Sequence, residues 1–441
     1  MGPFFPAKSL ICILGMDFCG KIQYNMHILV AENGRMAIHT MCGLCTWYNM
    51  HMLVAENGRM AIHTMCGLCT WYNDKMNYGR NGFRAAEQER ALMEEEKLPD
   101  FHQMHFNSIQ VLRGITAIFI LLEHIRFLNC GAFGVDIFFC ISGFMIMFST
   151  HKDSQHFLSK RLIRILPLYY LMTTGTFVLL LLFPSMFEQT KAHPAFLLKS
   201  LFFVPFDIGG GVLQPLMRIG WTVNCELFFY FLFGIALRIS HRFRGLFCGI
   251  FLIATVIIAR LVPAPPAPLD FYGNPVMLEF IYGIIAYYAA WEGYRLYQAK
   301  KLPRICLPLG VLSVLGCFCW LLVMKPYVNI LGFRRPLLWG LPALLIVLCA
   351  FLTELFAKKM PSPLIRLGDI SFSFYLMHYY PVMLLDRVVF DFSVCSLRAL
   401  AGTAVAIAVS VGLALVSHAL IETRLSGWLR RRLLMPPPPK P

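Results

Sequence analysis

Apolar residues dominate the chain from about residue 108 onward, and short polar stretches interrupt them at regular intervals. Most of the resulting ten segments are long enough to cross a membrane as a helix, which takes about 17–25 residues. A shorter apolar stretch, 196–206, is expected to lie at the membrane interface. The pattern therefore predicts an all-α, polytopic membrane protein with about ten transmembrane helices. The ten segments lie near 108–128, 132–150, 162–183, 222–238, 245–262, 275–293, 305–324, 337–356, 370–389 and 398–421.

Composition supports this fold class and argues against one kind of partner. The chain is 58% hydrophobic and 14% charged, whereas soluble domains contain about 25% charged residues. Its formal net charge of +15 would suit nucleic acid or anionic lipid as a partner. Most of the excess falls in short loops on one side of the predicted membrane domain, where the positive-inside rule explains it. We therefore expect no nucleic-acid partner.

The Lys and Arg residues of the loops predict how the spans are oriented. In alternate loops, taken together with the C-terminal tail, they are about twice as numerous as in the loops between them. Loops rich in Lys and Arg are typically cytoplasmic. Both ends of the membrane domain are therefore expected in the cytoplasm, and the protein is expected in the plasma membrane. The richer loops are 151–164, 239–244, 294–304 and 357–369.

The first hundred residues differ from the rest because they contain a tandem repeat. Residues 24–47 recur as 48–71 with one difference, Ile28 against Met52. Structural repeats usually drift, so near-identity indicates a recent duplication of DNA, and Met104 would make a compact start for the membrane domain. We interpret 1–104 as a doubtful or disordered N-terminal extension. The remaining parts are a membrane domain, 105–425, and a basic, Pro-rich cytoplasmic tail, 426–441.

Each copy of the repeat carries a His followed by a CxxC pair. Four thiolates could hold zinc, but the two pairs arose by one duplication and count as a single observation. The other cysteines are scattered through or beside apolar segments, which does not indicate a disulfide framework. We expect no metal site. The residues concerned are His39, Cys42, Cys45, His63, Cys66 and Cys69.

The first apolar segment, SIQVLRGITAIFILLEHIRF, carries Arg113 near its start and Glu123 and His124 near its end. Eleven residues at 100° each end 20° beyond three full turns, so Arg113 and His124 share one helix face, about 16 Å apart. A charged residue within a span costs roughly 2.5–3.5 kcal/mol, and lining a cavity is the usual reason to accept that. Alternatively, Arg113 snorkels to the headgroups and His124 pairs with Glu123 or a carbonyl. Glu123 points about 100° away from His124 and is not assigned as its orienting partner.

Further polar residues recur in the later segments. Arg161 and Arg164 lie one turn apart in KRLIRILPLYY, where they suit an anionic, phosphate-bearing ligand, although the positive-inside rule explains them equally well. Gly143 next to Ser142 allows close backbone approach. For each of the other candidates, structural pairing within the bundle is at least as plausible as chemistry. These supporting candidates are Asp136, Ser142, Trp221, Glu226, His378 and Glu422.

Taken in order, these segments resemble the acyltransferase 3 family, the ten-span membrane O-acyltransferases that modify bacterial surface and secreted glycans. LRGITAIFILLEH matches the family's Arg, ten residues, His motif, and RLIR matches its Arg-x-x-Arg motif. GVDIFFCISGFMI, WTVNCELFFY, SFSFYLMH and IETRL match its other signatures. The resemblance covers about residues 107–425 and is nearest in character to the exopolysaccharide acetyltransferases. The first hundred residues lie outside it.

The resemblance implies a membrane-bound O-acyltransferase that moves an acyl group, expected to be acetyl, from acyl-CoA to a hydroxyl of a cell-surface or exported polysaccharide. Acyl-CoA would enter from the cytoplasm as a substrate, the glycan acceptor would arrive from the outer side, and no tightly bound cofactor is expected. Arg113 and His124 would be the catalytic residues, with His124 as the base, because neutral imidazole works near pH 7. Arg113, Arg161 and Arg164 would bind the donor's phosphates.

An alternative is a transporter or flippase of a lipid-linked glycan, whose path the same charges would line. Transporters often show internal repeats, and no such symmetry relates the first five predicted spans to the last five.

Overall fold

The computed structural model describes residues 25–32, 35–42, 50–56, 59–65, 100–187, 192–208, 211–303, 305–328, 332–356 and 360–434. The chain divides into two compact units, Met1–Leu98 and Pro99–Pro441, and each is described by itself. The predicted boundary at residue 104 stays a prediction, although the division falls close to it. We call the second unit the membrane domain.

In the first unit, the two copies of the repeat form the same kind of hairpin. Strand β1 (Asn25–Glu32) pairs antiparallel with β2 (Arg35–Cys42), and β3 (Met50–Glu56) pairs in the same way with β4 (Arg59–Met65). Pairing of β2 with β3 joins the hairpins into one sheet. The sequence places Asn-Gly between the strands of each hairpin, a dipeptide favoured in two-residue hairpin turns. Of the two CxxC pairs, Cys45, Cys66 and Cys69 lie outside the described residues.

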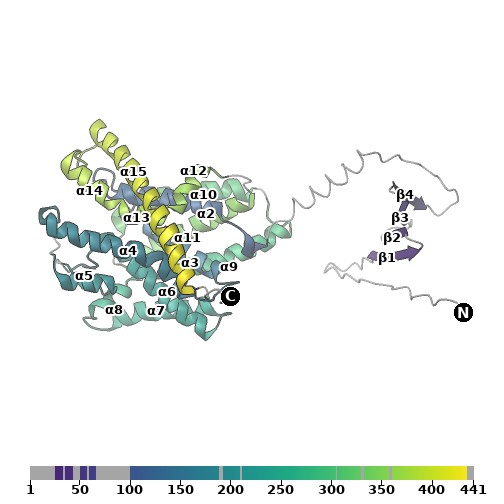
Figure 1. The fold of residues 1–441 in the computed structure, drawn as a ribbon, viewed down its shortest axis with the longest axis horizontal. Helices are drawn as coiled ribbons and strands as arrows, with labels where there is room; N and C mark the ends of the chain where they lie inside the picture. The colour runs from purple at the N-terminus through teal and green to yellow at the C-terminus, as the bar shows by residue number, and fades with distance from the viewer. Residues whose placement is uncertain are drawn as a thin grey trace, which may run out of the picture. The chain divides into compact units, whose positions relative to one another are not determined.

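The membrane domain is helical along nearly all of its described length, and each of the ten predicted segments contains at least one helix (Figure 1). Two-residue strands, β5 (Phe206–Asp207) and β6 (Leu213–Gln214), form a small pair before α6. The last helix continues through a π-helical turn, His418–Leu425, into the predicted tail. The helices are α2 (Asn107–Glu123), α3 (Gly134–Ser149), α4 (Phe157–Leu182), α5 (Pro194–Leu201), α6 (Trp221–Ile239), α7 (Arg244–Leu261), α8 (Ala267–Tyr272), α9 (Glu279–Gln298), α10 (Cys306–Val323), α11 (Leu341–Phe356), α12 (Ser362–Asp369), α13 (Ser371–Met377), α14 (Tyr379–Val388), α15 (Leu397–Ser417) and α16 (Ser426–Leu434).

The all-α, polytopic membrane class is confirmed. Among the described residues, six helical stretches are long and apolar enough to cross a membrane. The other four predicted spans are shorter, more polar or interrupted. Helices α2 and α3 have 17 and 16 residues, and α9 carries Glu279. The predicted span 370–389 is divided at His378 into α13 and α14. The number ten is therefore approximate. The six are Phe157–Leu182, Arg218–Ile239, Arg244–Leu261, Cys306–Val323, Pro336–Phe356 and Leu397–Leu434.

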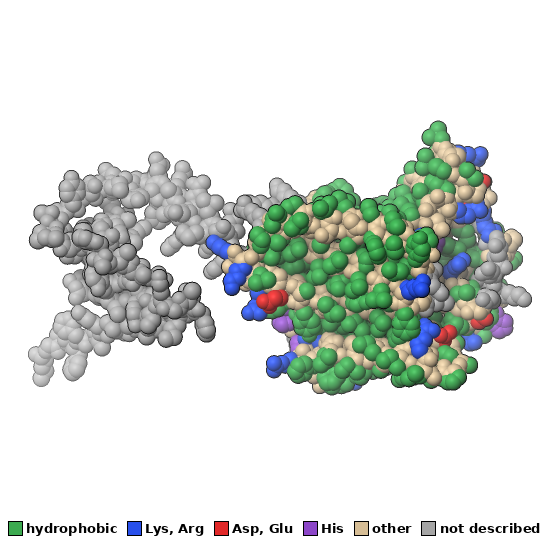
Figure 2. All heavy atoms as spheres, turned by 180° about the vertical axis from the view of Figure 1, so that it is seen from behind, with side chains coloured by type: hydrophobic (Ala, Val, Ile, Leu, Met, Phe, Trp, Pro, Cys, Tyr) green, Lys and Arg blue, Asp and Glu red, His purple; other side chains and the backbone are tan. Residues whose placement is uncertain are grey.

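The surface of the membrane domain is that of a protein surrounded by lipid. The face seen in Figure 2 is covered largely by hydrophobic side chains. Leu182, Leu261 and Leu312 are 64%, 74% and 66% exposed. A soluble protein rarely exposes contiguous apolar surface on this scale. Lipid-facing helices bear apolar side chains because polar and charged side chains are costly in lipid.

Glycines bring the central helices unusually close together. A Cβ atom added to Gly143 of α3 would lie 2.2 Å from the carbonyl oxygen of Phe280, and one added to Gly283 of α9 would lie 2.1 Å from that of Cys140. The close approach predicted at Gly143 is therefore confirmed, and it joins α3 to α9. A similar contact brings Gly368 of α12 against the backbone of Gln110 in α2.

A stack of rings anchors the segment that leads into α2. Asp100 accepts a hydrogen bond from the backbone N–H of His102. The His102 ring lies parallel to that of His151, with centroids 3.5 Å apart, and 4.8 Å from Trp291. Burial, with a smaller repulsion from His151, lowers the pKa of His102 from 6.5 to about 4. The stack is therefore neutral at pH 7.

Acidification is expected to weaken this anchor. Because the pKa of His102 is lower in the folded than in the unfolded chain, its neutral form contributes stability above about pH 6.5, which is lost as the pH falls toward about 4. Thermal unfolding in detergent, followed from pH 7 to pH 4, measures the loss. Asp100, Lys152 and Arg244 also face the stack, so the wild type is compared with His102→Phe, which keeps a ring but cannot titrate. Equal pH dependence in both proteins would contradict the assignment.

Candidate active site

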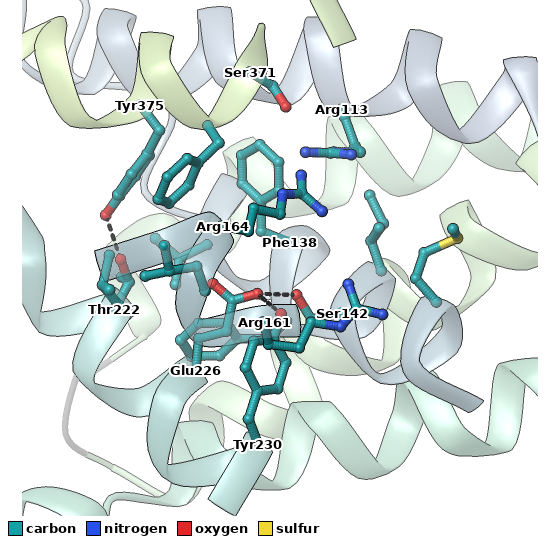
Figure 3. A pocket seen from close by; sticks show the side chains of 17 residues that line it. Arg113, Phe138, Ser142, Arg161, Arg164, Thr222, Glu226, Tyr230, Ser371 and Tyr375 are labelled. Carbon is teal, nitrogen blue, oxygen red and sulfur yellow. Dashed lines mark hydrogen bonds between the residues drawn. The ribbon is translucent and has the colours of Figure 1, made fainter. Parts of the chain in front are cut away.

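Five predicted site residues from four helices line one cavity. They come from α2, α3, α4 and α6, and the cavity between these helices and α13 has a volume of about 130 Å³. Figure 3 shows their side chains turned toward this space. We call it the arginine cavity. The five residues are Arg113, Ser142, Arg161, Arg164 and Glu226, and Thr222, Tyr230, Ser371 and Tyr375 complete its polar lining.

The single carboxylate of this lining, Glu226, is held by neighbouring hydroxyl groups. The Ser142 hydroxyl donates a hydrogen bond to Glu226 Oε1 at 2.9 Å, and the Tyr230 hydroxyl donates to the same oxygen. Figure 3 shows both bonds. Hydrogen bonds of this kind stabilise a buried carboxylate. The Ser142–Glu226 contact also ties α3 to α6, so the structural pairing considered for both residues is present.

The three arginines carry positive charge that the lining does not balance. Arg161 donates to the Ser149 hydroxyl at 2.7 Å and lies over the Tyr230 ring, and Arg113 donates to the Gln110 amide oxygen at 3.2 Å. The guanidinium groups of Arg113 and Arg164 lie next to each other (Figure 3). Within the described part of the chain, none of the three forms a salt bridge. Three guanidinium groups facing one carboxylate favour an anionic ligand.

His124 lines a second, larger cavity. Helix α2 ends at Glu123, and His124 caps it with its backbone N–H bonded to the Leu121 carbonyl. The second cavity, which we call the histidine cavity, has a volume of about 840 Å³. Residues Gly211–Gln214 also border it, within the loop between α5 and α6. The rest of its polar lining includes Trp221, Arg126, Arg218, Asp270, Tyr379 and Asp386.

The two cavities adjoin each other. Val135 and Tyr375 line both of them. Arg113 lies toward the start of α2 and His124 at its end, so the predicted pair faces two neighbouring spaces along one helix. The Tyr375 hydroxyl accepts a hydrogen bond from the Thr222 hydroxyl at 2.8 Å and donates one to the Ile219 carbonyl at 3.0 Å. A fixed side chain therefore stands between the arginines and the histidine.

Glu123 is occupied elsewhere, in agreement with the geometry expected from the helix. Its carboxylate accepts hydrogen bonds from the backbone N–H groups of Gly131 and Ala132 at 2.8 and 3.0 Å. Lys325 Nζ lies 2.8 Å from the same carboxylate. Glu123 thus fastens the turn after α2 and leaves His124 to other neighbours.

Asp136 belongs to a buried charge cluster that the sequence did not reveal. Arg335 donates two hydrogen bonds to its carboxylate, at 3.0 and 2.8 Å, and the two side chains are 2% and 0% exposed. Glu279 Oε1 lies 4.0 Å from the same guanidinium, and Trp221 and Trp339 lie against it. Arg335 opens the helical stretch that includes α11, at the edge of a predicted apolar segment.

Glu422, the last supporting candidate, lines neither cavity in the described part of the chain. Its carboxylate accepts hydrogen bonds from the backbone N–H and the hydroxyl of Ser373, and His418 lies 3.5 Å away. These contacts fasten α13 to the π-helical turn after α15. The structure also describes no group of three or more His, Cys, Asp or Glu residues that could hold a metal ion.

The described fold and site define a multi-pass membrane protein with an arginine-lined cavity that adjoins the cavity of a histidine. The sequence profile of the acyltransferase domain that defines the acyltransferase 3 family matches residues 106–416. The chain belongs to this family and is an acyltransferase. This finding favours group transfer, and we do not propose the transporter alternative.

Several curated proteins are similar to the chain. Exopolysaccharide production protein ExoZ of Rhizobium meliloti (strain 1021) is 34% identical over 270 residues, which cover 58% of this chain and 78% of that protein. O-acetyltransferase OatA of Staphylococcus aureus (strain NCTC 8325 / PS 47) is 24% identical, over 61% of this chain and 49% of its own. Putative peptidoglycan O-acetyltransferase YrhL of Bacillus subtilis (strain 168) is 25% identical, over 65% and 50%. The chain thus spans about half the length of the last two. No solved structure matches it significantly.

Proposed function

We propose that the protein transfers an acyl group, expected to be acetyl, from acyl-CoA to a hydroxyl of a cell-surface or exported polysaccharide. The observation that carries this proposal is the arginine cavity, where three guanidinium groups that form no salt bridge with a described residue adjoin the cavity of His124. An acyl-CoA donor has anionic phosphates at one end and a thioester at the other. The two ends fit these two sites.

Charge and distance support a donor with its phosphates at the arginines and its thioester near His124. Arg113, Arg161 and Arg164 would bind the phosphates, since guanidinium groups bind phosphate oxygens in a planar, bidentate way. His124 lies about 16 Å further along α2, within reach of an extended pantetheine arm. The loop before α4, 151–164, is among those rich in Lys and Arg. Helix α2 starts on the same side, because two spans separate its start from that of α4. We therefore propose that the arginine cavity opens to the cytoplasm of a plasma-membrane protein.

The acceptor hydroxyl would enter the histidine cavity from the outer side. Gly211–Gln214 border this cavity and belong to the longest loop expected on that side. His124 would take the hydroxyl proton as the new C–O bond forms at the acyl carbon. The C–S bond of the thioester then breaks, and His124 returns the proton to the leaving thiolate. The names of ExoZ and OatA, which concern exopolysaccharide production and O-acetyl transfer, support a glycan acceptor.

The first experiment follows the label. Membranes containing the protein are incubated with radiolabelled acetyl-CoA and with surface polysaccharide extracted from the host. Label is expected in the polysaccharide only when the protein is present. No incorporation, with donor and acceptor shown to be intact, would overturn the proposed donor or acceptor.

Replacing Arg164 with Gln is expected to raise the KM for acyl-CoA by about 10–100-fold, because a hydrogen bond to a charged group contributes about 1.5–3 kcal/mol. The measurement is the initial rate of label transfer against donor concentration. Arg295→Gln is the matched control, since Arg295 is exposed and pairs with Glu292 on α9. Equal KM values for the two variants would remove Arg164 from the donor site.

A further inference from the structure

We propose that His378 is the positioning residue for His124, holding the imidazole of His124 in the tautomer that can act as a base. The inference rests on the proposed function, because it concerns the same transfer step. It assigns a role to a buried side chain that lies where α13 meets α14.

The surroundings of His378 fix where its own proton lies. The side chain is fully buried, and its Nδ1 lies 2.7 Å from the carbonyl oxygen of Tyr375 and 3.3 Å from that of Phe374. A carbonyl oxygen only accepts hydrogen bonds, so Nδ1 carries the proton and donates it. Nε2 is therefore left with its lone pair.

This lone pair has no donor among the described residues. His378 Nε2 is buried and forms no hydrogen bond. A buried polar atom without a partner costs about 1–3 kcal/mol, and most such atoms in native proteins are satisfied. An acceptor kept free in this way next to a proposed active site indicates that it receives a hydrogen during function.

His124 is the neighbour that can supply the hydrogen. The ring centroids of His124 and His378 lie 5.2 Å apart at an angle of 38°. Two imidazoles joined edge to edge by an N–H···N bond of about 3 Å have ring centres about 5 Å apart. A rotation of the His124 ring, whose nitrogens bond to no other described residue, is enough to form that bond.

The other groups around His124 are less suited to the role. The Glu123 carboxylate is taken by Lys325 and by backbone N–H groups. Tyr379 meets His124 with its ring at nearly a right angle, 82°. Arg218, which lines the same cavity, is only a donor. Within the described residues, His378 is therefore the neighbour with a buried, free acceptor.

The bond would set the direction of proton transfer. With one His124 nitrogen donating to His378, the other nitrogen presents its lone pair to the histidine cavity and takes the acceptor's hydroxyl proton. After the C–O bond has formed and the C–S bond has broken, the proton leaves with the thiolate and His124 is neutral again. His378 keeps its own proton on Nδ1 throughout. Loss of His378 leaves the tautomer and the orientation of His124 unset.

The test compares variants of His378 in the label-transfer assay. His378→Leu is expected to lower kcat by about 10–100-fold, because His124 would lose part of the rate contribution of a positioned base. The KM for acyl-CoA is expected to stay unchanged. His378→Gln, whose amide oxygen can accept from His124, is expected to keep most of the rate. His105→Leu is the matched control, because His105 is exposed at the start of α2. If His378→Leu does not accumulate in membranes, His378→Phe, which keeps a flat ring without an acceptor, is expected to show the same loss.

A double-mutant cycle separates positioning from a structural role. If His378 acts through His124, adding His378→Leu to His124→Ala lowers the residual rate no further. The same factor lost in both backgrounds, or full kcat in His378→Leu, would overturn the inference. Wild-type protein that transfers no label is a different outcome, which counts against the proposed function itself.

Discussion

Replacing His124 with Ala is expected to lower the rate of acyl transfer by about 10²–10⁴-fold, the contribution typical of a general base. The fold is expected to survive, because the His124 ring forms no hydrogen bond with another described residue and lines a cavity. Alanine also keeps the backbone cap at the end of α2. The change therefore removes the proton acceptor and little else.

Two measurements check this expectation. Label transfer from radiolabelled acetyl-CoA gives the rate, and thermal unfolding in detergent shows whether the variant is folded. His193→Ala serves as a control, because His193 is the exposed N-cap residue of α5 and lines neither cavity. A folded His124→Ala protein that transfers label at the wild-type rate would exclude His124 as the base.

The sequence predicted the helices of the membrane domain better than it predicted their number. An apolar segment that crosses lipid must be helical, because unsatisfied backbone groups are not tolerated there. All ten segments are accordingly helical. The polar side chains of α2 and α9, such as Arg113 and Glu279, face the interior, and they lower the apolar length on which a count of spans depends.

The site was predicted as a set of residues, and the structure adds how they meet. Arg113, Arg161 and Arg164 were visible because arginine is rare within or beside apolar segments. Their convergence with Glu226 depends on how tightly the helices pack. A single sequence indicates close packing only at glycines such as Gly143. The division into two adjoining cavities, with Tyr375 between them, depends on side-chain packing alone.

Two features were missed for identifiable reasons. Arg335 directly precedes Pro336 at the edge of an apolar segment. At such an edge, the sequence does not distinguish an exposed loop arginine from a buried one. The available signal was Asp136, a carboxylate in a predicted span that needed a cation. The hairpins of the first unit carry Asn-Gly between their strands. This dipeptide predicts a hairpin turn in each copy, whereas the repeat itself was interpreted as part of a doubtful or disordered extension.

Replacing Arg335 with Met is expected to destabilise the fold by about 3–5 kcal/mol, as when one partner of a buried ion pair is removed. Arg335 is the cation for Asp136 and lies 4.0 Å from Glu279, and both carboxylates are fully buried. Without the guanidinium, two buried carboxyl groups remain without a cation. Equilibrium unfolding in mixed detergent micelles measures the change.

A second replacement distinguishes the ion pair from simple loss of packing. Asp136→Leu added to Arg335→Met removes one of the two unpaired carboxyl groups, so the double variant is expected to be more stable than Arg335→Met alone. Arg295→Met is the matched control, since its pair with Glu292 is exposed and worth less than about 1 kcal/mol. Charge pairing would be contradicted if Arg335→Met changed stability no more than Arg295→Met does, or if the double variant were the least stable of all. Packing around Trp221 and Trp339 would then have to explain why Arg335 is buried. The buried pair would otherwise stand as a contact that joins α3 to the helical turn before α11, at the wall of the histidine cavity, which Arg335 also lines.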